Sequence, residues 1–205
     1  MPESRTEKEL RYIAGLAQTE ERYLCKLDVG GSNPSTGSIL RKKNMEWDLT
    51  EFVRESNKIE NINRDPLASE INAHHALLEK ARYLTVQDIC DFVDVVQPGA
   101  KLRTLPHMNV RVGNHIPPRG GEHVRFILEG ILLKVNKRDG TPHAVHLDYE
   151  KLHPFMDGNG RSGRAIWLYM MFKENRMREA LGFGFLRAFY YQTLAEHESK
   201  TGYEK

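Results

Sequence analysis

The sequence HPFMDGNGRSGRAIWLYMMF, residues 153–172, decides the fold of this chain. Its second half, residues 165–172, is apolar at every position and lacks the polar face of a surface helix. We therefore predict that this half forms a buried helix at the centre of a helical bundle. The first half is rich in glycine and arginine, which are poor choices for the packed start of a helix and need a different explanation.

Amphipathic segments lie on both sides of the buried helix. Thr85 and Asp88 have the spacing of a capping box, Thr141 followed by Pro142 is a typical helix start, and Asp48 can cap a helix that ends near Asn61. Together they predict an all-α domain. Apolar residues recur at helical spacing in residues 6–27, 48–61, 65–82, 85–97, 124–135, 141–152 and 185–198.

Two stretches break this helical pattern. Residues 30–38 are rich in Gly, Ser, Asn and Pro, so we expect a loop there. Residues 1–47 would then form an N-terminal helix and loop, followed by one domain over residues 48–205. Residues 99–120 also lack a helical period; residues 108–112 alternate and Gly113 with Asn114 offers a turn, which predicts a short β-hairpin.

Composition excludes several classes of protein. The 205 residues carry 30 Lys and Arg against 28 Asp and Glu, a net charge of +2, so the global basic excess of a nucleic-acid-binding protein is missing. Two cysteines are too few for a disulfide scaffold. No apolar run reaches the ~20 residues of a membrane span, and the N-terminus has no signal-peptide core. We therefore expect a cytoplasmic protein with neither nucleic acid nor membrane as a partner.

The glycines and arginines of the first half fit a site for an anion. Gly158 and Gly160 would let backbone N–H groups approach phosphate oxygens at a helix start, where the helix dipole favours negative charge. Arg161 and Arg164 lie on one face of the first turn, where two cations oppose that dipole unless an anion is bound. The pattern predicts phosphate oxygens held by N–H and guanidinium groups.

Two further side chains fit the chemistry of a nucleotide. Asp157 beside a polyphosphate is a natural ligand for Mg²⁺, which usually takes one or two carboxylates together with substrate oxygens. His153 belongs to the residue type whose ordinary pKa lies near neutrality, so it can accept a proton from a hydroxyl group. Together they indicate a nucleoside triphosphate site with a general base.

Two other interpretations compete for residues 158–163. They match the dinucleotide pattern GxGxxG, but that pattern requires a preceding strand and a βαβ unit, whereas a predicted helix precedes it here. The other alternative is an ordinary glycine-rich loop with surface arginines. That loop would explain the glycines alone, but not the twelve residues 153–164 taken together.

Residues 153–164 match the signature H-x-F-x-[DE]-G-N-G-R-x-x-R. In this the chain resembles the Fic family, whose members transfer AMP from ATP to protein hydroxyl groups. The resemblance covers residues 48–198 and implies a Fic-type helical bundle with a small β-hairpin flap. The related, kinase-like Doc toxins alter the glycine-rich core of the motif, so the intact core here favours nucleotidyl transfer.

The resemblance implies a role for each motif residue. His153 would deprotonate a Ser, Thr or Tyr hydroxyl of a target protein, which then attacks the α-phosphorus of ATP. Asp157 would hold Mg²⁺. ATP would be bound by Gly158, Asn159 and Gly160 as an anion hole, by Arg161 near the β-phosphate and by Arg164 at the γ-phosphate.

A second motif lies upstream of the first. Ser56, Glu60 and Asn61 fit the pattern [ST]-x-x-x-E-[GN] of the family's inhibitory helix, and Ser56 and Glu60 share one helical face. The resemblance implies that Glu60 pairs with Arg164, removes the anchor of the γ-phosphate and inhibits the same chain. Without the resemblance, Glu60 would be an ordinary solvated glutamate.

The predicted hairpin corresponds in position to the family's flap, which aligns an extended target segment by strand addition. Four flap residues are candidates for holding the modified side chain, although the same residue types in a loop also suit simple packing. They are Val110, Val112, His115 and Ile116.

Two classes of function remain open at this point. The chain is either an autoinhibited protein adenylyltransferase, acting on a target protein or on itself, or a non-catalytic ATP-sensing or interaction module on the same fold. The presence of both His153 and Asp157 favours the enzyme, because binding alone needs neither a base nor this metal ligand. The sequence leaves open the target, the oligomeric state and removal of AMP by water that Glu60 activates.

Overall fold

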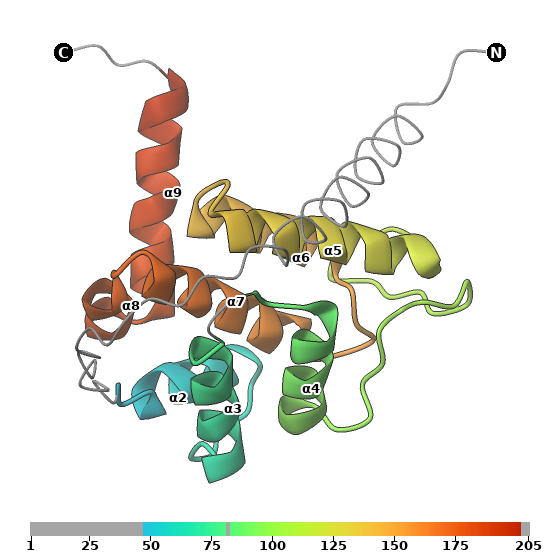
Figure 1. Cartoon of the computed structure of the whole chain (residues 1–205), viewed down its shortest axis with the longest axis horizontal. Coiled ribbons are helices and arrows are strands. Elements are labelled where there is room, and N and C mark those ends of the chain that lie inside the picture. The colour runs from blue at the N-terminus through green and yellow to red at the C-terminus, as the bar shows by residue number, and fades with distance from the viewer. Residues whose placement is uncertain (1–46, 81–82, 202–205) are drawn as a thin grey trace, which may run out of the picture. The chain divides into compact units, whose positions relative to one another are not determined.

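The computed structural model describes residues 47–80 and 83–201. The chain divides into two units, Met1–Asp48 and Leu49–Lys205, and all helices described here belong to the second (Figure 1). The predicted helix at residues 6–27 and the loop after it lie outside the described residues. The expected all-α fold is confirmed, with α2 (Thr50–Ile59), α3 (Ala68–Leu78), α4 (Val86–Val96), α5 (Glu122–Lys137), α6 (Pro142–Leu152), α7 (Asn159–Lys173), α8 (Met177–Phe183) and α9 (Phe185–Thr201).

Helix α7 is the centre of this unit, as its apolar sequence predicts. It contacts α2, α3, α4, α6 and α8, and Figure 1 shows it between the α5–α6 layer and the α2–α3 pair. Trp167 in its middle is fully buried. Phe52 of α2 stacks on the indole at a centroid distance of 6.3 Å, and Phe185 of α9 meets it edge-on at 5.1 Å. The N- and C-terminal helices are thus joined through one side chain.

Helix starts with strong local signals form where the sequence predicts them. The Thr85 hydroxyl accepts a hydrogen bond from the Asp88 N–H, and the Asp88 carboxylate accepts one from the Thr85 N–H. Thr141 caps α6 through the Ala144 N–H. The predicted Asp48 cap is wrong, because Leu49 is the N-cap residue of α2 and gives no side-chain bond.

The short helix α8 has no counterpart among the predicted elements. It spans seven residues, which is too short to present a helical period of its own. Gly184 separates it from α9 with a φ of +74°, a conformation that glycine adopts at little cost.

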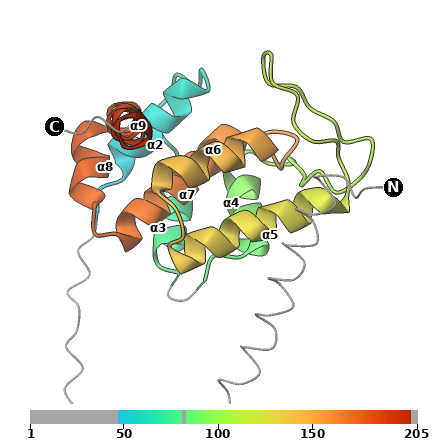
Figure 2. The ribbon, with the colours of Figure 1, turned by 90° about the horizontal axis from the view of Figure 1, so that it is seen from above.

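The predicted β-hairpin forms only at its tip. Val112 and His115 exchange backbone hydrogen bonds of 3.0 and 2.9 Å around Gly113 and Asn114, but the pairing does not extend, and the described residues include no strand. Pro117 and Pro118 explain this in part, because proline has no N–H to donate to a ladder. Figure 2 shows the segment as a long loop projecting from the helices. We keep the name flap for residues 103–118.

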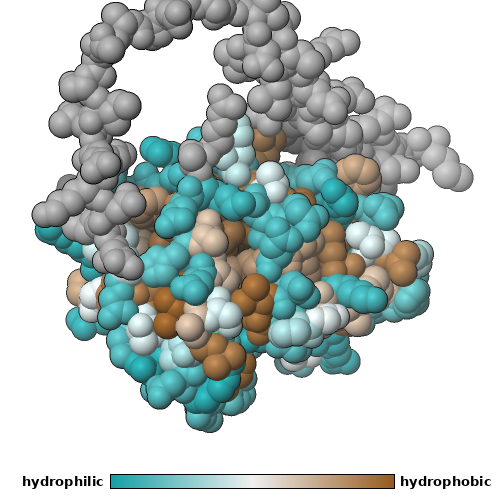
Figure 3. Space-filling view, turned by 60° about the horizontal axis from the view of Figure 1, so that its bottom comes forward, coloured by the Kyte–Doolittle hydropathy of each residue, from teal (hydrophilic) through white to brown (hydrophobic). Residues whose placement is uncertain are grey.

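No helix within the described ranges has the length and apolar character needed to cross a membrane. Figure 3 shows hydrophobic side chains interspersed with hydrophilic ones on the face it draws. The more exposed large apolar residues include Leu186 and Tyr190 on α9 and Ile116 in the flap.

Candidate active site

The loop between α6 and α7 is held by Asn159. Its side-chain oxygen accepts a hydrogen bond from the Phe155 N–H, and its amide group donates to the Phe155 carbonyl, both at 2.8 Å. Phe155 itself is buried, as expected for a residue that fixes the loop. Because the Asn159 side chain already binds the loop, only the backbone N–H of Asn159 would be available for the predicted anion hole.

His153 ends α6 in a left-handed conformation with a φ of +49°. Its N–H donates to the Tyr149 carbonyl at 2.9 Å, and its side chain is 15% exposed. Burial, reinforced by the positive charge of Arg103, lowers the pKa of His153 below its usual value. The imidazole is therefore neutral near pH 7, which is the state that a general base requires.

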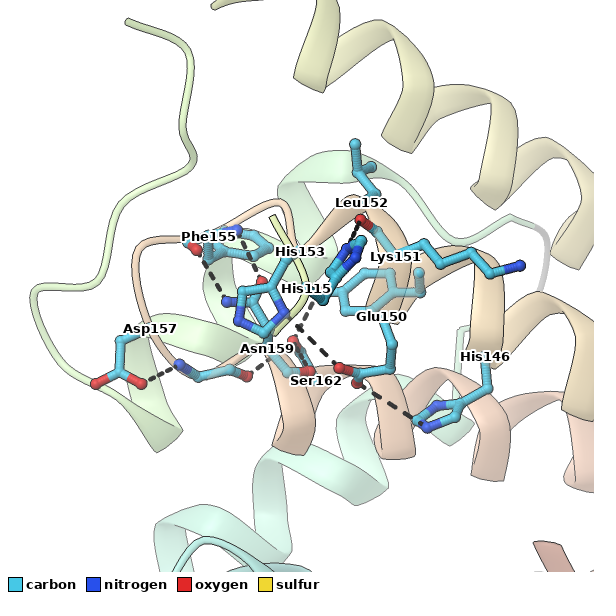
Figure 4. Close-up of polar contacts among 12 residues, drawn as sticks. His115, His146, Glu150, Lys151, Leu152, His153, Phe155, Asp157, Asn159 and Ser162 are labelled. Carbon is cyan, nitrogen blue, oxygen red and sulfur yellow. Dashed lines mark hydrogen bonds and ion pairs between the residues drawn. The ribbon is translucent and has the colours of Figure 1, made fainter. Parts of the chain in front are cut away.

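The ring of His153 faces a carboxylate that the sequence analysis did not single out. The Nδ1 atom lies 3.8 Å from Glu150 Oε2, and Figure 4 shows the Glu150 carboxylate between the rings of His153 and His146. His146 packs within the bundle against Phe185 and Phe189.

The N-terminus of α7 has no side-chain cap. Gly158 is the N-cap residue with a φ of +78°. The first N–H groups of a helix have no partner within the helix and carry its positive dipole end. This geometry suits phosphate oxygens, as the glycines predict.

Both arginines near the start of α7 bind the C-terminal ends of other helices. Arg161 donates to the Val96 carbonyl at the end of α4 and to the Gln97 side chain. Arg164 donates to Ser56 of α2, through Nε to the hydroxyl at 2.8 Å and through Nη2 to the carbonyl at 2.9 Å. The negative dipole ends of these neighbouring helices therefore also stabilise the two cations, in addition to any anion at this helix start.

Glu60 lies at this helix start as well. Its Oε1 accepts a hydrogen bond from Arg164 Nη2 at 2.6 Å, so the ion pair implied by the resemblance is present. Arg164 is 5% exposed and Glu60 is 37% exposed. A Cβ atom added to Gly160 would collide with Glu60 Oε1. A carboxylate oxygen thus lies directly against the glycine that the sequence assigned to an anion hole.

Other contacts hold α2 in this position. Glu55 accepts hydrogen bonds from the Phe185 and Leu186 N–H groups at the start of α9, at 2.6 and 3.1 Å. Asn57 is buried and donates to Glu70 of α3 at 3.2 Å. Asn61 follows α2 in a left-handed conformation with a φ of +60° and is exposed.

Asp157 is exposed and is oriented by two neutral donors. Its Oδ1 accepts from the Gly158 N–H and its Oδ2 accepts from the Gln97 side-chain amide, both at 2.7 Å. Within the described part of the chain, no group of three or more His, Cys, Asp or Glu could hold a metal ion. The site therefore fits a cation such as Mg²⁺, which accepts a single carboxylate and takes its other ligands from substrate and water.

Arg103 joins the flap to the catalytic loop. Its guanidinium is buried and donates to four carbonyls: His153 at 2.7 Å, Leu152 at 2.8 Å, Pro118 at 2.8 Å and Met108 at 3.2 Å. Its backbone N–H also donates to the Pro154 carbonyl at 2.9 Å. The two limbs of the flap are thus connected through a side chain instead of a strand ladder.

We expect Arg103→Lys to lower the free energy of unfolding by about 2–4 kcal/mol, because one ammonium group cannot serve four buried carbonyls. Urea denaturation measures the change. Arg111→Lys is the matched control, since Arg111 is exposed in the same flap and donates to one carbonyl, that of Gly113. Equal stability of the two variants would show that the Arg103 contacts contribute little.

The structure brings only part of the predicted flap set to the catalytic loop. His115 Nε2 lies 2.8 Å from the Lys151 carbonyl, which ties the flap to the last turn of α6. Val110 is half-buried, whereas Val112 and Ile116 are 41% and 72% exposed. The exposed pair remains free to contact another chain.

Sequence reasoning missed three residues of the site: Gln97, Arg103 and Glu150. Glu150 carries a usable signal, because it lies three residues before His153 and four after His146, on one face of a helix. Gln97 and Arg103 give none, since their partners are far away in the sequence.

Comparison with known proteins assigns the chain to a family. Residues 74–171 match the family model described as Fic/DOC family. This range contains the motif at 153–164 but not α2, so the match does not bear on Ser56 or Glu60. No curated protein matches the chain. By this match, its helical fold and its motif, the chain contains a Fic/DOC family domain over residues 74–171.

Proposed function

We propose that this Fic/DOC protein transfers AMP from ATP to a hydroxyl group of a target protein. The observation that carries the proposal is the juxtaposition of a neutral His153 with the uncapped N-terminus of α7, against which a carboxylate already lies. A base next to an anion site is what nucleotidyl transfer to an alcohol requires.

In the proposed reaction, His153 Nε2 accepts the proton of the target hydroxyl as its oxygen attacks the α-phosphorus of ATP. One oxygen–phosphorus bond forms, the bond from the α-phosphorus to the bridging oxygen breaks, and pyrophosphate leaves with the electron pair. The N–H groups at Gly158, Asn159 and Gly160 would hold phosphate oxygens. Mg²⁺ on Asp157 would neutralise phosphate charge.

We also propose that α2 inhibits the same chain. Glu60 would occupy the position of a phosphate oxygen and bind Arg164, which the resemblance assigns to the γ-phosphate. Ser56 would contribute by holding the same guanidinium. Movement of Glu60 away from Arg164 would then be needed before ATP binds productively.

The target would present its hydroxyl alongside the flap. Val112 and Ile116 are exposed there and would contact the target segment, whereas His115 is already bound to α6. The partner is thus proposed to be a protein segment rather than a free small molecule.

ATP labelled at either the α- or the γ-phosphate tests the reaction. Glu60→Gly is incubated with Mg²⁺, labelled ATP and cell lysate, and is compared with Glu60→Gly/His153→Ala. The proposal expects protein to take up the α-label only, and only with the first variant. Uptake of the γ-label would indicate phosphate transfer. Nucleotide binding by both variants without any label on protein would indicate the non-catalytic module.

A further inference from the structure

The side chain of Glu150 is half-buried, 31% exposed, but its Oε1 atom is buried without the donors that a buried carboxylate oxygen normally has. Oε1 accepts no hydrogen bond. His146 Nε2 lies 4.0 Å from Oε1, and His153 Nδ1 lies 3.8 Å from the other oxygen, Oε2. A buried carboxylate oxygen with no donor is costly, and such groups concentrate where a protein needs them for function.

The fold makes room for this carboxylate. Gly163 of α7 faces it, and a Cβ atom at that position would lie 2.6 Å from Glu150 Oε1. A larger residue there would displace the carboxylate from between α6 and α7. Gly163 is therefore explained by close packing against Glu150, whereas Gly158 and Gly160 were assigned to an anion site.

Of the two histidines beside Glu150, only His153 can be stabilised in its charged form by the negative carboxylate. Burial lowers the pKa of His146 to about 4, so this ring is neutral at physiological pH and its edge packs on Phe185 and Phe189. His153 has a partly accessible ring and gains a positive charge whenever it accepts a proton. Its Nδ1 faces Glu150, which leaves Nε2 for the substrate.

We infer that Glu150 is a positioning residue for His153, which orients the imidazole with Nε2 toward the substrate and stabilises the imidazolium formed when Nε2 accepts a proton. This inference rests on the proposed function for its role in the reaction. The physical coupling between the two side chains does not depend on it.

Because Glu150 itself gains and loses a proton, its effect on His153 should depend on pH. Burial raises the pKa of Glu150 to about 7, with Glu60 of α2 raising it further and Arg164 of α7 opposing that change. His146 and His153 are the titratable groups that face it from α6. Glu150 therefore carries its charge on the alkaline side of this value and loses it on the acid side.

Titration of His153 by NMR in the histidine-labelled full chain tests the coupling without any transfer reaction. The His153 signal is identified by its loss in His153→Ala. At the alkaline end of the titration, where Glu150 is charged, we expect the nitrogen shifts of His153 to show less of the Nδ1-protonated tautomer in Glu150→Gln than in the wild-type chain, and Glu150→Asp to restore part of the difference. Asp148→Asn is the matched control, because Asp148 is also an α6 carboxylate but pairs with Lys134 on α5. Unchanged His153 nitrogen shifts in folded Glu150→Gln at the alkaline end of the titration overturn the inference.

The pH profile of AMP transfer in the Glu60→Gly background provides the second readout. We expect the further change Glu150→Gln to lower the rate about 10-fold at pH 8. The difference should shrink as the pH falls and Glu150 takes up its proton. A loss equal at every pH would indicate a merely structural role and overturn the inference. Coupling seen by NMR together with no transfer by Glu60→Gly would reject the proposed function and leave the coupling intact.

Discussion

Glu60→Gly is expected to raise the rate of AMP transfer about 10- to 100-fold, because charge-assisted hydrogen bonds contribute about 1.5–3 kcal/mol and this one ties down Arg164. The Arg164 side chain is nearly inaccessible, so solvent screens its ion pair with Glu60 only partly. Removing the carboxylate takes away the one anionic partner that the guanidinium has among the described residues, leaves its bonds to Ser56, and opens the space beside Gly160. The rate of label transfer from α-labelled ATP measures the effect.

Two further variants separate the effect of the Glu60 charge from the effect of loosening helix α2. Lys58→Gly places a glycine in the same last turn of α2 at an exposed residue, and we expect it to leave the rate unchanged. Glu60→Gln keeps the shape but removes the charge, so it should activate less than glycine does. Activation by Lys58→Gly to the same extent as by Glu60→Gly would mean that loosening α2 is sufficient, whatever its contact with Arg164.

His153→Ala in the Glu60→Gly background is expected to lower transfer about 10²- to 10⁴-fold, the usual contribution of a general base. ATP affinity should change little, because His153 lies on the loop before the helix start that would hold the phosphates. Isothermal titration with ATP and Mg²⁺ separates binding from turnover. Retention of most of the rate in the double variant would remove His153 from the mechanism.

The pH dependence of the same assay follows in part from the lowered pKa of His153. The base is neutral above that pKa and becomes protonated below it, so the rate should fall as the pH drops through the lowered value, in addition to the loss that protonation of Glu150 causes at higher pH. His107→Ala is a suitable control, since His107 is exposed in the flap and has no assigned role. Its profile should coincide with that of Glu60→Gly alone.

The fold could be predicted in part from local signals, because two helix starts carry side-chain caps and the central helix has a distinctive apolar sequence. Thr85 with Asp88 and Thr141 with Pro142 define two starts correctly, and residues 165–172 define the buried centre. The hairpin could not be predicted from alternation alone. Its two limbs are joined by the guanidinium of Arg103, and an arginine that binds only backbone carbonyls leaves no partner residue to recognise.

The candidate site, like the fold, could be predicted from the sequence only in part. The motif from His153 to Arg164 predicts which residues gather, since a short loop brings them together regardless of the rest of the fold. The sequence could not predict what Arg161 binds. Its partner is the carbonyl end of α4, and every residue type has a carbonyl. The dipole argument considered α7 alone and so did not foresee that α2 and α4 end beside the two arginines, where their carbonyls also stabilise the cations.

The contacts of Arg103 also constrain the order of folding. Its guanidinium binds the His153 carbonyl, which is 50 residues away in the sequence, with α5 and α6 between them. Closing such a loop costs chain entropy that only a formed α5–α6 pair can offset. The Arg103 N–H donates to the Pro154 carbonyl, and the Gly121 N–H donates to the Arg103 carbonyl. Both amides should therefore gain protection from hydrogen exchange together and late in folding. A chain interrupted after α5 would lack the Leu152, His153 and Pro154 carbonyls, so its flap would stay unanchored until α6 and the loop after it are in place.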